Sequence, residues 1–182
     1  MTVEAQIDRK ERLRQLRRLR DDFQLFARKM LRIRDKAGNM VPLILNSAQQ
    51  YVHREVEDQL AATGKVRALV LKGRQQGIST YTGGRYYHKA ATQRGVNVYI
   101  LAHEQSASDN LFAMVDRYQR HNKMAPHTGI SNAKELRFDK LDSGYVVATA
   151  GQKAGGRSRA STLMHGSEVA FWTNAAEHFS AS

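Results

Sequence analysis

Two apolar runs of strand length, each followed by a turn and a segment of helical length, constrain the fold of this chain most. The first run covers residues 66–71 and the second covers residues 96–102. Short and nearly continuous apolar runs of this kind predict strands that are buried on both faces. Strands that alternate with helices run parallel, because a parallel connection must cross over one face of the sheet. We therefore predict an α/β fold with a mostly parallel central sheet.

The rest of the chain extends this pattern. Helices are predicted over residues 81–93 and 107–120 from their length and apolar spacing. Residues 135–138 and 145–148 flank Asp142-Ser143-Gly144, which predicts a hairpin. A weaker apolar run follows at residues 162–165. The carboxyl ends of parallel strands form the usual ligand-binding edge of such a sheet.

The amino-terminal segment predicts a basic helical arm, residues 1–38, ahead of a second unit at residues 39–182. No proline or glycine interrupts residues 5–36, and apolar side chains recur there at three- and four-residue spacing, which predicts one amphipathic helix. Its arginines either contact DNA or a partner, or pair with carboxylates of the same helix. Those carboxylates are Asp8, Glu11, Asp21 and Asp22.

A second helix is predicted over residues 48–62. Asn46 or Ser47 caps its start, and Thr63-Gly64 ends it. Ahead of it, Gly38-Asn39 predicts a turn, and residues 41–45 form a short extended run.

Charge and composition narrow the class of function. The formal net charge is +12, and in residues 1–40 twelve Lys and Arg stand against six Asp and Glu. A positive field of this size concentrates polyanions such as nucleic acid. The chain has no cysteine, which excludes a disulfide framework and a thiolate metal site. It has no apolar run of about 18 residues, so we expect no membrane partner.

The segment from Lys72 to Thr80 predicts a phosphate-binding loop. A phosphate needs converging backbone N–H groups, which a glycine-flanked turn at a helix N-terminus supplies. Only three residues, Arg74, Gln75 and Gln76, separate Gly73 from Gly77, and Ile78 stands where a phosphate loop carries lysine. Arg74 or Lys72 is expected to supply that charge, and the Ser79 hydroxyl to bind Mg²⁺, with Thr80 as the alternative. The alternative interpretation of these glycines is an ordinary strand-to-helix turn that binds no ligand.

Glu168 is the candidate catalytic carboxylate. Hydrolysis of a phosphoanhydride needs a carboxylate near the tip of a strand, where it orients water or the metal. Glu168 follows the run at residues 162–165, and Ser167 stands where an aspartate usually supports Mg²⁺. A helix cap ahead of Asn174 is the other interpretation of Glu168.

Three segments together resemble one family, the large terminase subunits of tailed phages. Residues 72–80 look like the deviant Walker A loop of that family, in which an Arg-Gln pair precedes the glycine. Residues 165–172, with the trailing Glu-x-Ala-Phe-Trp, resemble its Walker B segment. Residues 45–49 are similar to its adenine-recognition segment, which assigns Gln49 to the adenine edge, with Gln50 as the adjacent alternative.

The resemblance covers residues 41–178 and implies a three-layer P-loop NTPase of the ASCE type that hydrolyses ATP with Mg²⁺. It implies Arg157, or else Arg159, as an arginine finger that acts on a neighbouring subunit, hence a homo-oligomeric ring. The implied partners are double-stranded DNA, a portal protein and a small terminase subunit, in the host cell cytoplasm. It also implies that the later core strands and the nuclease domain follow the last motif, so that residues 39–182 form a partial ATPase domain.

Two departures from the family pattern keep other functions open. Ile78 replaces the lysine of some members, and Ser167 replaces the usual aspartate, which puts Mg²⁺ ligation and the rate of turnover in doubt. A non-catalytic DNA-binding or assembly module is the first alternative, in which the basic amino-terminal helix and the loop at residues 151–159 bind DNA phosphate and the phosphate loop is degenerate. A helicase-like ATPase is the second.

Overall fold

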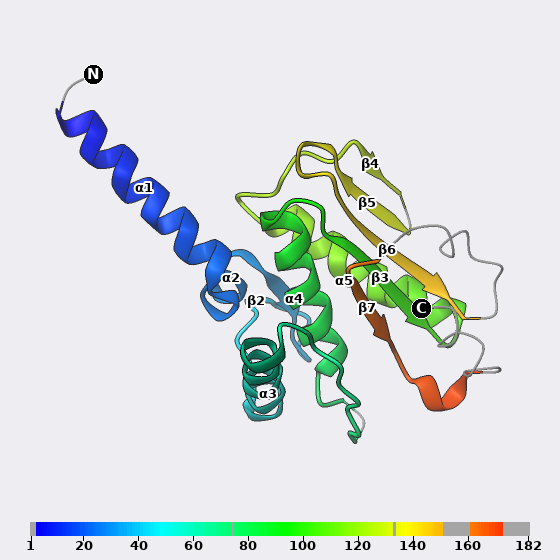
Figure 1. Cartoon of the computed structure of the whole chain (residues 1–182). Coiled ribbons are helices and arrows are strands. Elements are labelled where there is room, and N and C mark those ends of the chain that lie inside the picture. The colour runs from blue at the N-terminus through cyan, green and yellow to red at the C-terminus, as the bar shows by residue number, and fades with distance from the viewer. Residues whose placement is uncertain (1–2, 74, 133, 151–160, 173–182) are drawn as a thin grey trace.

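The computed structural model describes residues 3–73, 75–132, 134–150 and 161–172, the first six of them by their backbone alone. A five-stranded sheet of order β4-β5-β6-β3-β7 forms its centre (Figure 1). Strand β3 (Asn97–Ala102) pairs in parallel with β6 (Ser143–Thr149) on one side and with β7 (Leu163–Gly166) on the other. The prediction of an α/β fold with a largely parallel sheet is confirmed for these three strands.

The predicted hairpin is also confirmed. Strand β5 (Glu135–Phe138) pairs antiparallel with β6, and the 3-10 turn η1 (Asp139–Leu141) connects them. Strand β4 (Ile130–Ser131) adds a second antiparallel strand at this edge. The sheet is therefore mixed, with its parallel half on the side of β7.

Helices α4 (Ile78–Thr92) and α5 (Gln105–His121) cover the same face of β6. The Tyr145 hydroxyl of β6 donates to the Gly83 carbonyl of α4 at 3.4 Å, and the Ser108 hydroxyl of α5 lies 2.8 Å from that of Thr149. A Cβ on Gly83 would lie 2.8 Å from the Met114 methyl of α5, so a larger residue there requires the Met114 side chain to move. The other face of β6 is partly exposed in the described residues, and the second helical layer of a three-layer fold stays a prediction.

The single amino-terminal helix predicted over residues 5–36 is wrong. The chain forms α1 (Val3–Asp21) and α2 (Phe23–Met30), separated at Asp22, whose carboxylate accepts from the Leu25 N–H at 2.9 Å. An aspartate that caps a new helix competes with continuation of the old one, which explains the break. Strands β1 (Arg32–Arg34) and β2 (Met40–Pro42) then form a separate antiparallel pair.

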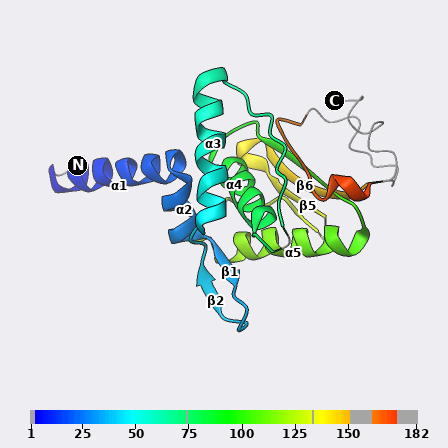
Figure 2. The ribbon, with the colours of Figure 1, turned by 90° about the horizontal axis from the view of Figure 1, so that it is seen from below.

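Helix α2 belongs to the main core, whereas α1 projects from the body of the molecule (Figures 1 and 2). Phe23, Phe26 and Leu31 are buried in the same cluster as Leu43 and Tyr81. Of the carboxylates expected to pair with the arginines of this segment, Asp8 lies outside the described side chains, and Asp22 caps α2. No helix in the described ranges is both long enough and apolar enough to cross a membrane.

The strand predicted over residues 66–71 is wrong. This segment is irregular and its side chains point into solvent, with Leu69 99% and Leu71 104% exposed. A strand forms only beside another strand that completes its hydrogen bonds. In the described part of the chain no strand pairs with residues 66–71, so this segment does not form a strand despite its apolar residues.

Helix α3 (Ser47–Thr63) confirms the predicted second helix and its caps. Asn46 and Gln49 form a reciprocal capping box at its start, and Gly64 ends it with φ +69°. This helix packs beside α4 and brings the capping box to the start of α4 (Figure 2).

His88 joins the end of α1 to the core. Its Nε2–H donates to the Leu19 carbonyl at 2.8 Å, and its ring lies 4.5 Å from the Phe26 ring between centroids. Burial lowers the His88 pKa to about 4, so the imidazole is neutral in the folded protein.

This burial predicts a loss of stability in acid. Below pH 6.5 the unfolded chain takes up a proton at His88 that the folded chain does not, so the unfolding free energy falls until about pH 4, by roughly 3 kcal/mol at 1.4 kcal/mol per pH unit. Urea unfolding between pH 7 and pH 4 measures it. His88→Gln is expected to make the pH dependence shallower by this contribution, and the exposed His121→Gln is the control. An unchanged slope in His88→Gln would rule out the buried neutral imidazole.

Candidate functional site

The predicted phosphate loop is a tight turn that ends at the start of α4. Gln75 and Gly77 both have left-handed backbones, with φ 61° and 72°. Gly77 stands before the first helical residue and provides no side-chain cap, so the first N–H groups of α4 have no side-chain acceptor. Of the predicted residues, Lys72, Gly73, Gln75 and Gln76 are exposed, and Ser79 and Thr80 are partly exposed. Ile78 is buried, and Arg74 lies outside the described residues.

Two side chains from the start of α3 hold this turn. The Gln49 amide donates to the Gly77 carbonyl at 2.7 Å, and the Asn46 amide donates to the Gln76 carbonyl at 3.3 Å. Gln49 is only 4% exposed, and its Oε1 accepts from the Asn46 backbone N–H at 3.0 Å. The predicted adenine-reading residue therefore contacts the phosphate loop directly, which the sequence did not indicate.

Helices α3 and α4 are tied together along their length by a polar network. The Arg85 guanidinium, 8% exposed, pairs with the Glu57 carboxylate. His53 Nδ1 lies 3.2 Å from the Tyr81 hydroxyl and 3.6 Å from Glu57. These contacts add to the Gln49 and Asn46 hydrogen bonds that attach α3 to the start of α4.

Glu168 lies in a tight turn after β7. Its backbone is left-handed, with φ 56° and ψ 46°, and the 3-10 turn η3 (Val169–Phe171) follows. The Ser167 N–H donates to the Leu101 carbonyl at 2.8 Å, and the Trp172 indole donates to the Ser167 carbonyl at 3.1 Å. A Cβ on Gly166 would lie 3.0 Å from the Trp172 ring. The turn is thus held by β3 on one side and by Trp172 on the other, with the Glu168 side chain exposed.

The loop and the Glu168 turn lie at the same end of the sheet (Figures 1 and 2). The Tyr86 hydroxyl of α4 donates to the Met164 carbonyl of β7 at 2.9 Å. Burial, with a smaller contribution from the Lys72 ammonium, lowers the pKa of His165 on β7 to about 4. The Lys72 ammonium, at the front of the loop, therefore disfavours a positive charge on His165 of β7.

His103 is a site residue that the sequence only hinted at by its place after a strand. Its Nδ1 lies 3.2 Å from a Glu168 carboxylate oxygen. Ser167, the predicted Mg²⁺ ligand, is buried at 8% exposure. Arg157 and Arg159 lie outside the described residues, as does the stretch near Asn174.

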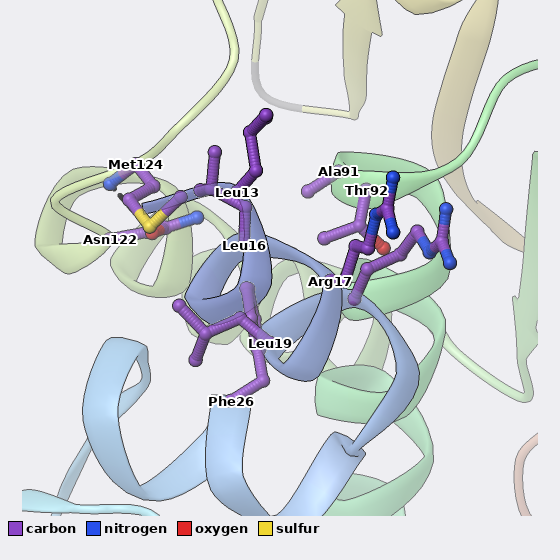
Figure 3. Close-up of a pocket in the computed structure, with 10 residues that line it drawn as sticks. Leu13, Leu16, Arg17, Leu19, Phe26, Ala91, Thr92, Asn122 and Met124 are labelled. Carbon is purple, nitrogen blue, oxygen red and sulfur yellow. Dashed lines mark hydrogen bonds between the residues drawn. The ribbon is translucent and has the colours of Figure 1, made fainter. Parts of the chain in front are cut away.

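A separate pocket beside α1 contains none of the predicted site residues (Figure 3). Its apolar lining comes from Leu13, Leu16 and Leu19 of α1, together with Phe26 and Met124. The candidate site is instead an open edge formed by two turns.

The close approach at Gly77 predicts a sensitive position. Ala at Gly77 would adopt a left-handed backbone and place its Cβ 2.6 Å from the Gln49 amide nitrogen, so it must also break the Gln49 contact. Gly64→Ala is the matched control, since Gly64 has φ +69° and open space around it. We expect a loss of about 1 kcal/mol for Gly64→Ala and about 2 kcal/mol or more for Gly77→Ala in denaturant unfolding. Equal losses would argue against the Gln49 contact.

Comparison with known proteins identifies the fold. No protein-family model matches the sequence, and no curated protein matches it. A solved structure, the crystal structure of the HK97 bacteriophage large terminase, is similar with a TM-score of 0.60 at 16% sequence identity. The match covers 74% of this chain and 28% of that chain. The chain thus shares its fold with part of a phage large terminase.

Proposed function

We propose that this chain is the ATPase motor domain of a viral terminase large subunit, which hydrolyses ATP to drive double-stranded DNA into a procapsid. The observation that carries the proposal is the position of two turns. The loop at the start of α4 and the carboxylate after β7 lie at the same end of a sheet whose fold is shared with a phage large terminase. This is the end of a parallel sheet where α/β proteins bind ligands.

The loop provides the groups that a triphosphate requires. The uncapped N–H groups of α4 and the left-handed turn at Gly77 favour an anion. Arg74, or else Lys72, supplies the charge of the missing loop lysine, since the buried Ile78 in that position has none. Gln49, or Gln50 beside it, reads the adenine edge.

A Mg²⁺ ion fits the donor set because ATP itself supplies most of its ligands. The partly exposed hydroxyl of Ser79, with Thr80 as the alternative, is of the type that binds Mg²⁺ beside phosphate oxygens, and Ser167 adds a second hydroxyl on the opposite turn. When bound, the ion neutralises charge on the phosphates. Glu168 orients and deprotonates the attacking water, and Arg157 acts on the nucleotide of a neighbouring subunit in a ring.

Removing the Glu168 carboxylate tests the enzyme. Glu168→Gln is expected to lower the rate of ATP hydrolysis by 10²-fold or more while Mg-ATP still binds, because only proton transfer is lost. Glu55→Gln, an exposed carboxylate on α3, is the control and keeps the wild-type rate. Hydrolysis and nucleotide binding are measured separately, with and without duplex DNA.

Absence of both binding and hydrolysis in the wild type favours the alternative, a non-catalytic DNA-binding module. The burial of Ile78 in the lysine position is the observation that speaks for it. Unwinding of a duplex with a single-stranded tail would favour the helicase-like ATPase instead.

Helix α1 is our proposed contact to DNA. Among the described residues, five of its exposed arginines have no carboxylate partner, while Arg20 pairs with Asp21 at 2.7 Å. The five are Arg9, Arg12, Arg14, Arg17 and Arg18. Unpaired guanidinium groups on a projecting helix suit phosphate contacts. The portal protein and the small terminase subunit are the further partners in this proposal.

Neutralising one face of α1 tests the DNA contact. Arg14 and Arg18 are one helical turn apart, so Arg14→Gln with Arg18→Gln removes two neighbouring charges. We expect weaker duplex binding and a salt dependence shallower by about 2 in log–log slope. The control is Arg120→Gln with Arg137→Gln, two arginines that pair with carboxylates. If both double variants weaken duplex binding equally, α1 contributes only through the total charge of the chain and is not a specific DNA contact.

A further inference from the structure

His103 and Glu168 meet because their strands pair in register. Leu101 of β3 lies opposite Gly166 of β7, and His103 and Glu168 each lie two residues after this pair. The Ser167 N–H bond to the Leu101 carbonyl continues the pairing to the residue before Glu168. The contact is therefore set by backbone hydrogen bonds on both sides.

The imidazole offers Glu168 a donor that nothing else uses. His103 Nδ1 is buried, lies 3.2 Å from Glu168 Oε2, and makes no hydrogen bond of good geometry within the described ranges. A small rotation of the Glu168 side chain completes that bond, because a carboxylate only accepts. The other nitrogen, Nε2, lies 3.8 Å from the Glu104 carboxylate, and the Phe171 ring lies 5.9 Å from the imidazole. The ring is thus held between two carboxylates and an aromatic side chain.

We propose that His103 is the positioning residue for Glu168, an inference that rests on the proposed ATPase function. The Nδ1–H donates to one carboxylate oxygen and leaves the other free to face water. In the hydrolytic step that free oxygen takes a proton from water. The water oxygen bonds to the γ-phosphorus, and the bond from that phosphorus to the bridging oxygen of ADP breaks.

The need for such a partner follows from the Glu168 backbone and exposure. Its left-handed conformation sets where the side chain begins, but the side chain is exposed and its carboxylate ends a chain with several rotatable bonds. Misplacing a catalytic group by about 1 Å costs about 10²-fold in rate. A buried donor on the neighbouring strand fixes that carboxylate without touching the nucleotide.

Kinetics of two His103 variants test the proposal. His103→Ala is expected to lower kcat by about ten-fold or more with KM within about two-fold, because positioning affects the reacting geometry and not nucleotide binding. His103→Asn places an amide nitrogen where Nδ1 stands and is expected to recover much of the loss. Thermal unfolding confirms that both variants fold. An unchanged kcat in His103→Ala overturns the proposal. A raised kcat also overturns it, because the His103 contact would then hold the Glu168 carboxylate away from the attacking water.

A second measurement does not depend on ATP hydrolysis. The imidazole ¹⁵N chemical shifts of His103 in the whole chain report which nitrogen carries the proton. Glu168→Ala is expected to move the Nδ1 signal clearly, and Glu104→Ala, the matched control, to leave it nearly in place. No change in Glu168→Ala overturns the contact itself. If the signal responds but the wild type hydrolyses no ATP, the contact stands while the ATPase function and the positioning role fail.

Discussion

The parallel pairing of β3 with β7 is the interaction on which the candidate site depends. Strand β7 lies at the edge of the sheet and hydrogen-bonds to β3 alone among the described strands. Its register brings the turn after β7 against the residues that follow β3, and so sets the distance between Glu168 and His103. A shift of one residue would point the side chains of β7 to the opposite face, so the site requires this register.

The second constraint is the attachment of the glycine turn before α4 to α3. Gln49 and Asn46 donate to consecutive loop carbonyls, and they also form the capping box of their own helix. The loop conformation and the start of α3 are therefore held by the same two amides. The Glu57–Arg85 pair also links α3 to α4, so the loop lies between two helices that contact each other directly.

Local signals predicted those parts of the fold that are decided by neighbouring residues. The caps at Asn46 and Gly64 and the turn of the β5–β6 hairpin depend on side chains within a few positions, and the structure confirms them. The helix over residues 5–36 failed because an Asp22 cap competed with an equally good helical pattern. The strand over residues 66–71 failed because apolar composition does not supply a hydrogen-bonding neighbour.

By itself the sequence determined an α/β chain with parallel strands, a glycine turn before a helix, and a carboxylate after a strand, since each follows from residue type and spacing. The tertiary structure alone decided which side chains meet. Gln49 and Gly77 are 28 positions apart, and His103 and Glu168 are joined only through strand register. Such contacts depend on how elements pack, which periodicity along one segment does not encode.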